Sequence, residues 1–290
     1  MQKIIDTHFH IFDLNQFRVL WLEQEEILNR PILLSEFEEL RTGKEYEVIG
    51  GVHIELDTIV EQKAMENQYF EQLAKDRKDF IKGTILYADM LDIHMKETIQ
   101  QYAASEGVKG IRYILHVDEA KPGTCLEPIF VDNMKKLGEL GLHFEACLRS
   151  IELDDLYQLG LQCPDTKIVL NHMGLPDVTA WKDTSRIKEV ELWKVGIQKL
   201  ATLPQVTCKM SGLSSVNIEE IKPLVEWCIE QFGIDRVMFA SNFPVCNLSI
   251  SFPTWTEAMM DILAEYTEEE RNQFFYKNAL KIYRAKEEAQ

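Results

Sequence analysis

The sequence predicts a single (β/α)8 barrel of the α/β class, in which eight parallel strands form the core and a helix follows each strand. Eight short apolar runs alternate with longer segments of helical periodicity, and no shift in composition divides the chain. A length of 290 residues is typical of one such barrel. Residues 1–290 are therefore expected to form one domain. An open, doubly wound sheet is the alternative, but no Gly-x-Gly-x-x-Gly motif follows the first strand.

The apolar runs place the expected strands. The first ends in Asp6-Thr7-His8-Phe9-His10, and the others occupy residues 48–55, 80–86, 108–115, 142–148, 167–171, 206–210 and 236–240. The expected helices occupy residues 58–78, 95–105, 128–140, 153–161, 187–200, 217–232, 254–266 and 268–284. Helix-end signals support them at Pro128, Gly141, Asn217 and a Thr267-x-x-Glu270 capping box. Residues 11–44 lack a sustained period and are expected to form a long functional loop with about one helical turn.

Charge and cysteine usage indicate the compartment and exclude some partners. The chain has 31 Lys and Arg against 48 Asp and Glu, a net charge of −17, which would repel nucleic acid and anionic lipid. Its six cysteines are scattered without a Cys-x-x-Cys pair, as in a reduced cytoplasmic protein. No apolar run approaches the roughly 18 residues that a membrane span requires. We expect a cytoplasmic protein with a small-molecule substrate and no nucleic-acid or membrane partner; the sequence leaves the oligomeric state open.

Polar residues follow most of the expected strands, and the carboxyl ends of barrel strands are where active sites lie. Alternation along the first strand places His8 and His10 on one side. The later strands contribute Glu55, Arg112, Glu145, Asn171, His172, Lys209, Ser241 and Asn242. Taken singly, Arg112 fits a rim salt bridge, Lys209 an extended surface residue and Glu145 a solvated strand end. The other histidines, at expected strand starts or in loops, are expected to be structural: His53, His94, His116 and His143.

Five motifs in order carry a resemblance to a known family. They are the Asp6–His10 segment, Lys109-Gly-Ile-Arg112, Asn171-His-Met-Gly-Leu-Pro176, Lys209-Met-Ser-Gly-Leu213 and Phe239-Ala-Ser-Asn-Phe-Pro-Val245. The chain resembles the amidohydrolase-2 type of metal-dependent hydrolase, and within it the sugar-lactone and pyrone-dicarboxylate lactonase group. The resemblance implies a hydrolase of carbohydrate metabolism that opens a small cyclic ester, such as a sugar-acid lactone, by attack of water.

The resemblance also implies roles for the residues at the strand ends. His8, His10 and His172 surround the reacting carbonyl, and Arg112 and Lys209 bind substrate oxygens, with Glu55 and Glu145 beside them. Some relatives of this kind work without a metal whereas other amidohydrolases bind zinc, so a divalent metal, zinc first, is a candidate cofactor on His8, His10 and His172.

Two residues depart from the family pattern. Asn242 stands where the eighth strand usually ends in Asp, and an amide cannot accept the proton of the attacking water. Asn242 is therefore expected to orient the water, while His172, Glu145 or Glu55 takes the proton. Leu175 stands where relatives often carry a cation, which argues against a di- or tricarboxylate substrate. No Gly-x-Ser-x-Gly motif indicates a serine hydrolase.

Two other functions stay open at this point. One is a metal-dependent non-oxidative decarboxylase of the same superfamily, against which Asn242 argues because those enzymes typically carry an acid there. The other is a non-catalytic barrel that binds a sugar acid after losing its base. Turnover separates the enzymes from the binding barrel, and release of carbon dioxide separates decarboxylase from lactonase.

Overall fold

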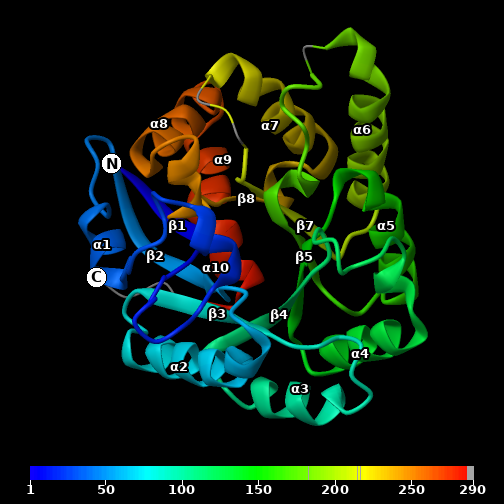
Figure 1. The fold of residues 1–290 in the computed structure, drawn as a ribbon. Helices are drawn as coiled ribbons and strands as arrows, with labels where there is room; N and C mark the ends of the chain where they lie inside the picture. Colours follow the sequence, from blue (N-terminus) through cyan, green and yellow to red (C-terminus); the bar gives the residue numbers. More distant parts are fainter. Residues whose placement is uncertain (182, 214, 216, 286–290) are drawn as a thin grey trace.

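The computed structural model describes residues 1–181, 183–213, 215 and 217–285, and these form the expected barrel (Figure 1). Its eight parallel strands lie side by side in chain order. The strands are β1 (Gln2–Phe9), β2 (Tyr46–Ile54), β3 (Ile81–Tyr87), β4 (Val108–Ile114), β5 (His143–Cys147), β6 (Ile168–Leu170), β7 (Val206–Met210) and β8 (Val237–Phe239). Each expected strand is therefore present, within a few residues of its predicted ends.

Helices surround the strands in Figure 1. They are α1 (Leu34–Glu39), α2 (Lys63–Asp76), α3 (Met95–Ala103), α4 (Pro128–Glu139), α5 (Leu153–Gln162), α6 (Ile187–Ala201), α7 (Ile218–Phe232), α8 (Phe252–Ile262), α9 (Glu268–Asn272) and α10 (Asn278–Ile282). A π-helical turn over Gln273–Lys277 joins α9 to α10, and the capping box at Thr267 is present. The loop over residues 11–44 contains more helix than expected, because Leu22 and Phe37 each anchor a short helical segment in the core.

Contacts between the first and last strands close the barrel at its carboxyl end. The hydroxyl of Thr7 donates to the carbonyl of Phe239 at 2.7 Å. The backbone N–H of Asn242 donates to the carbonyl of His8 at 2.8 Å. Asp6, which is fully buried, accepts hydrogen bonds from the backbone N–H of Ser241 at 2.9 Å and from its hydroxyl. These bonds place the end of β8 directly beside the His-x-His segment.

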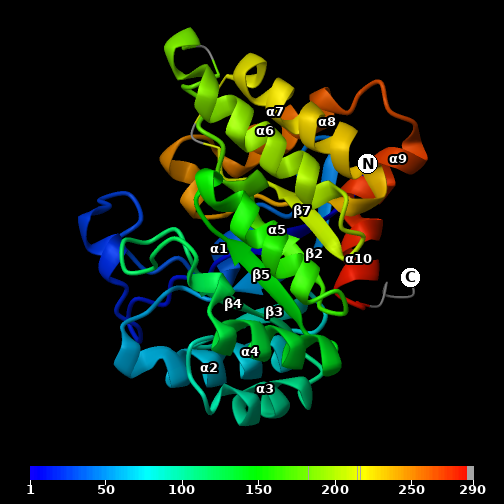
Figure 2. The ribbon, with the colours of Figure 1, turned by 90° about the vertical axis from the view of Figure 1, so that its right-hand side faces the viewer.

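The C-terminal helix closes the opposite end. An apolar cluster inside the barrel, with Ile54 and Val169 among its strand residues, continues into Ile282 and Tyr283. Figure 2 shows α10 on the other side of the barrel from the loop that joins β1 to α1. Since α10 seals the amino ends of the strands, the carboxyl ends and their loops are left to form the site.

Candidate functional site

A cavity opens at the carboxyl ends of the strands. Its volume is about 330 Å³, which suffices for a small ligand. Five residues singled out in the sequence lie on its wall: His10, Arg112, His172, Leu175 and Asn242. The wall also includes residues that no sequence pattern indicated, among them Trp21, Asp57, His116 and Cys147. The structure thus brings the segments that follow β1 and β8, and the ends of the middle strands, to one space.

Three imidazoles form a cluster at the base of this site. The ring of His8 lies 5.1 Å from that of His10 and 4.5 Å from that of His172, measured between centroids. His10 Nδ1 lies 2.9 Å from the carbonyl of Ile54, so Nδ1 carries the proton and Nε2 is left as an acceptor. His172 Nδ1 lies 2.8 Å from the hydroxyl of Ser211, and neither ring nitrogen of His8 has a partner among the described residues.

The imidazoles of this cluster are neutral at pH 7. Burial, together with the nearby Arg112 guanidinium, lowers the pKa of His10 to about 3. Burial likewise holds the pKa of His8 and of His172 well below the usual range, with additional repulsion from the buried Lys209 ammonium. Neutral rings can ligate a metal or donate a hydrogen bond to a carbonyl, but a strongly lowered pKa makes them weak bases.

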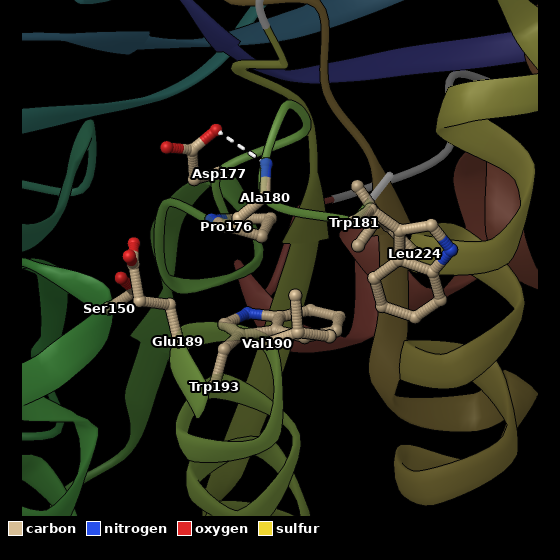
Figure 3. A pocket seen from close by; sticks show the side chains of 9 residues that line it. All are labelled: Ser150, Pro176, Asp177, Ala180, Trp181, Glu189, Val190, Trp193 and Leu224. Atoms are coloured by element: carbon tan, nitrogen blue, oxygen red, sulfur yellow. Dashed lines mark hydrogen bonds between the residues drawn. The ribbon is translucent and has the colours of Figure 1, made fainter. Parts of the chain in front are cut away.

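The turn after β6 holds His172 in a left-handed conformation. The φ angles of His172, Met173 and Leu175 are 54°, 53° and 52°. Trp193 on α6 donates its Nε1–H to the carbonyl of Met173 at 2.7 Å, and Figure 3 shows the Trp193 ring below Pro176. On the other side, a Cβ at Gly212 would lie 2.6 Å from Cγ of His172. Strained backbone held this firmly is typical of functional sites.

Arg112 lies on the cavity wall, but its guanidinium already has buried partners. Nε donates to Glu55 Oε1 at 2.6 Å, and a terminal nitrogen donates to the Glu55 carbonyl at 2.7 Å. Lys63 Nζ lies 3.5 Å from the same carboxylate. Burial alone would raise the pKa of Glu55, but Arg112 and Lys63 outweigh it and hold this pKa at about 2. The ion pair fixes Arg112 and leaves little net positive charge for a substrate.

Lys209 and Glu145 form a second ion pair, inside the barrel. Lys209 Nζ lies 2.7 Å from Glu145 Oε2, and both side chains are fully buried. Glu145 also accepts hydrogen bonds from Asn171 Nδ2 at 2.5 Å and from the Tyr283 hydroxyl at 2.7 Å. Lys209 as an extended surface residue and Glu145 as a solvated strand end are therefore wrong interpretations. Substrate binding by Glu55, Glu145 and Lys209 stays a prediction. None of the three is among the residues that line the cavity.

His116, expected to be structural, lines the cavity, and its structural role stays a prediction. His53 lies within β2, inside the strand expected over residues 48–55, and stacks on Phe70 with ring centroids 3.8 Å apart. Position alone would have identified Cys147, which is the last residue of β5, whereas His116 lies in the loop after β4.

The donor set does not fit a preformed zinc site. Zinc usually takes three or more protein ligands, and neutral imidazoles with free nitrogens on His8 are suitable ones. Across the described residues, however, no three His, Cys, Asp or Glu side chains converge as metal ligands. At the position where a carboxylate could complete a zinc site, this chain has the amide Asn242. The Glu145 carboxylate is already paired with Lys209.

We therefore expect the purified protein to hold zinc weakly and below one equivalent. The measurement is elemental analysis after dialysis against a chelator, with the Asn242→Asp variant as comparison. That variant adds a carboxylate beside the imidazoles and should retain more metal. One tightly held equivalent in the natural protein would show that a ligand outside His8, His10 and His172 completes the shell.

The helices offer no candidate for a bilayer crossing: across the described residues, each is too short or too polar to span one.

Comparisons with known proteins agree with the barrel and the motifs. The family model described as amidohydrolase matches residues 5–285. The uncharacterized protein y4mH of Sinorhizobium fredii is 30% identical over 97% of this chain and 98% of its own length. L-rhamnono-gamma-lactonase of Scheffersomyces stipitis is 25% identical, again over 97% and 98%. An amidohydrolase of Burkholderia multivorans solved with bound zinc has a TM-score of 0.86 at 19% identity, over 98% and 99% of the two chains, which shows a shared fold.

Proposed function

Since the chain belongs to the amidohydrolase family, in its lactonase-like group, we propose that it hydrolyses the lactone of a neutral or monoanionic sugar acid. The observation that carries the proposal is the cavity at the strand ends, where neutral imidazoles and Asn242 surround a space whose one arginine is already paired. These groups suit the polarisation of an ester carbonyl. They offer little to a substrate that must be held by several free cations.

The chemistry of ring opening can be assigned to these groups. A hydroxyl from water is added to the lactone carbonyl, the bond to the ring oxygen breaks, and a hydroxy acid leaves. When the Ser211 hydroxyl donates to His172 Nδ1, Nε2 carries the proton and can donate to the developing oxyanion. Asn242, on the same wall, can orient the attacking water through its amide without accepting the proton.

The cavity wall supports a neutral substrate. Arg112 is neutralised by Glu55, and Leu175 lies on the wall where a cation would recognise a second carboxylate. Leu56, Ile114 and Val117 add apolar surface. The relative named L-rhamnono-gamma-lactonase supplies the first candidate, L-rhamnono-1,4-lactone. We expect aldonolactones to be opened in preference to 2-pyrone-4,6-dicarboxylate in a pH-indicator assay.

Asn242→Ala should lower lactonase activity by about tenfold to a thousandfold, the range for loss of one positioned polar group. Asn242→Asp should keep or raise it, because the added carboxylate can accept a proton. Ser249→Ala, in the loop beyond Asn242, serves as a neighbouring control and should leave kcat/KM unchanged. Full activity in Asn242→Ala would remove this residue from the mechanism.

Asn242 also favours one alternative, a barrel that binds a sugar acid without turning it over. Its signature would be measurable lactone or sugar-acid binding by calorimetry with no hydrolysis, and hydrolysis appearing in Asn242→Asp alone. Release of carbon dioxide from a carboxylated aromatic would instead identify the decarboxylase.

We further propose that the protein works in the cytoplasm. The support is that all six cysteines are free thiols, which is the state that a reducing compartment maintains.

A further inference from the structure

We propose that Cys147 and His116 form a nucleophilic pair in the cavity, in which the Cys147 sulfur accepts the acyl group of the ligand as a thioester. This inference rests on the proposed lactone hydrolysis and divides it into two steps: the sulfur attacks the lactone carbonyl, and the water that Asn242 orients then attacks the thioester. Neither residue is part of the imidazole cluster around His8.

The geometry of the pair is that of a thiol and its base. Cys147 Sγ lies 3.3 Å from His116 Nδ1, and both residues line the cavity. Cys147 is the last residue of β5 and is 2% exposed, whereas His116 lies in the loop after β4 and is open to solvent. The backbone N–H of Leu115 donates to the carbonyl of Cys147 at 2.8 Å, so the loop that carries His116 is fastened to the end of β5.

The surrounding charges favour the thiolate form. Burial raises the pKa of the Cys147 thiol and Glu55 raises it further, but His116 and Arg112 outweigh them, so the net pKa lies below the usual value. The Cys147 sulfur in turn raises the pKa of His116 against the effect of burial. A thiol beside an imidazole and a guanidinium is the environment in which cysteines become nucleophiles.

Other groups near the substrate are poorly suited to take a proton. Asn242 is an amide, and Glu55 is held ionised in its pair with Arg112. Burial keeps the pKa of His10 and of His172 low, which makes both rings weak bases. Asp57, the carboxylate on the wall, lies 2.6 Å from Lys63 Nζ. Among the imidazoles on the wall, His116 therefore has the pKa best matched to proton transfer.

The reaction balances in two steps. His116 takes the thiol proton as Cys147 Sγ bonds to the lactone carbonyl carbon; the bond to the ring oxygen breaks, and that oxygen receives the proton from His116. A water then adds to the thioester carbonyl and gives its proton to His116, and the carbon–sulfur bond breaks. The products are the hydroxy acid and the regenerated thiolate pair.

The first test measures the pair without any lactone. Whole protein is treated with iodoacetamide and each cysteine is followed by peptide mass spectrometry. We expect Cys147 to react at least about tenfold faster than the other five, Cys125, Cys163, Cys208, Cys228 and Cys246. Burial raises the pKa of Cys125 to about 12 and of Cys163 to about 11. His116→Gln should slow labelling of Cys147 about tenfold. Equal labelling of all six would overturn the inference.

The second test measures the thioester. Protein quenched in acid during turnover of L-rhamnono-1,4-lactone, or of the best lactone in the panel, should gain the mass of one lactone on Cys147, and hydroxylamine should remove it. Cys147→Ala should lose about a hundredfold or more in kcat/KM, with Cys125→Ala as the matched control that keeps it. Natural kcat/KM in Cys147→Ala overturns the inference and leaves lactone hydrolysis standing. Selective alkylation without turnover of any lactone contradicts the hydrolysis and the thioester step, and leaves only the reactive pair.

Discussion

Lys209→Met is expected to lower the free energy of unfolding by about 3–5 kcal/mol, the usual cost of removing one partner from a buried ion pair. The methionine fills a similar volume, so the loss arises mainly from charge. Glu145 would remain fully buried with the Asn171 amide and the Tyr283 hydroxyl as its donors, and neither offsets the loss of the ammonium. Urea denaturation at pH 7 measures the change.

Two further variants separate charge from packing. Lys209→Met combined with Glu145→Gln removes both charges and should recover most of the lost stability, since no uncompensated carboxylate is left. Lys75→Met, which removes an exposed partner of Glu71 on α2, is the control and should change stability by about 0.5 kcal/mol or less. A Lys209→Met protein as stable as the natural one would show that this pair contributes nothing to folding.

Acidification is expected to destabilise the fold by several kcal/mol between pH 7 and pH 5. Burial lowers the folded-state pKa of five histidines: His8, His10, His53, His143 and His172. Below the unfolded pKa of about 6.5, the unfolded chain binds protons that the folded protein excludes. As the pH falls, each histidine then lowers the free energy of unfolding by up to about 1.4 kcal/mol per pH unit. This loss continues until the pH approaches the folded-state pKa, which is about 3 for His10 and His143.

Two carboxyl groups oppose this trend. Burial raises the pKa of Asp6 to about 6 and of Glu66 to about 7, so the folded protein takes up protons there before the unfolded chain does. Their contribution grows as the pH falls towards their ordinary pKa near 4, but two groups do not balance five. The measurement is urea denaturation at pH 7.5, 6.5 and 5.5. A free energy of unfolding that rises as the pH falls from 7.5 to 5.5 would show that the imidazoles are protonated in the folded state.

The barrel was predictable because its signals are local. Each strand is a short apolar run followed by a helical period, and alternation along the first strand suffices to put His8 and His10 on one side. The rule that barrel sites lie at the carboxyl ends of strands then selected His10, Arg112, His172 and Asn242, all of which line the cavity.

The partners of these residues were not predictable, because they depend on which side chains meet across the barrel. Arg112 and Glu55 are 57 positions apart; Arg112 belongs to β4, whereas Glu55 directly follows β2, and β3 lies between these strands. The sequence showed a cation and an acid at strand ends and could not show that each neutralises the other. Trp21 and His116 lie in loops whose course is set by packing, so no periodicity in the sequence predicts that they line the cavity.

The bonds that close the barrel also set the time at which the site can exist. Asp6 meets Ser241 across 235 positions of the chain, and the backbone of His8 meets that of Asn242 beside them. A ribosome that adds about 5–20 residues per second needs roughly ten to fifty seconds to travel between the two segments. During that interval His8 and His10 are already present in the first strand, but the segment that contains Asn242 has not yet been made. Catalysis therefore begins only after synthesis has passed the segment around Asn242, and activity in a nascent or refolding sample reports closure of the barrel.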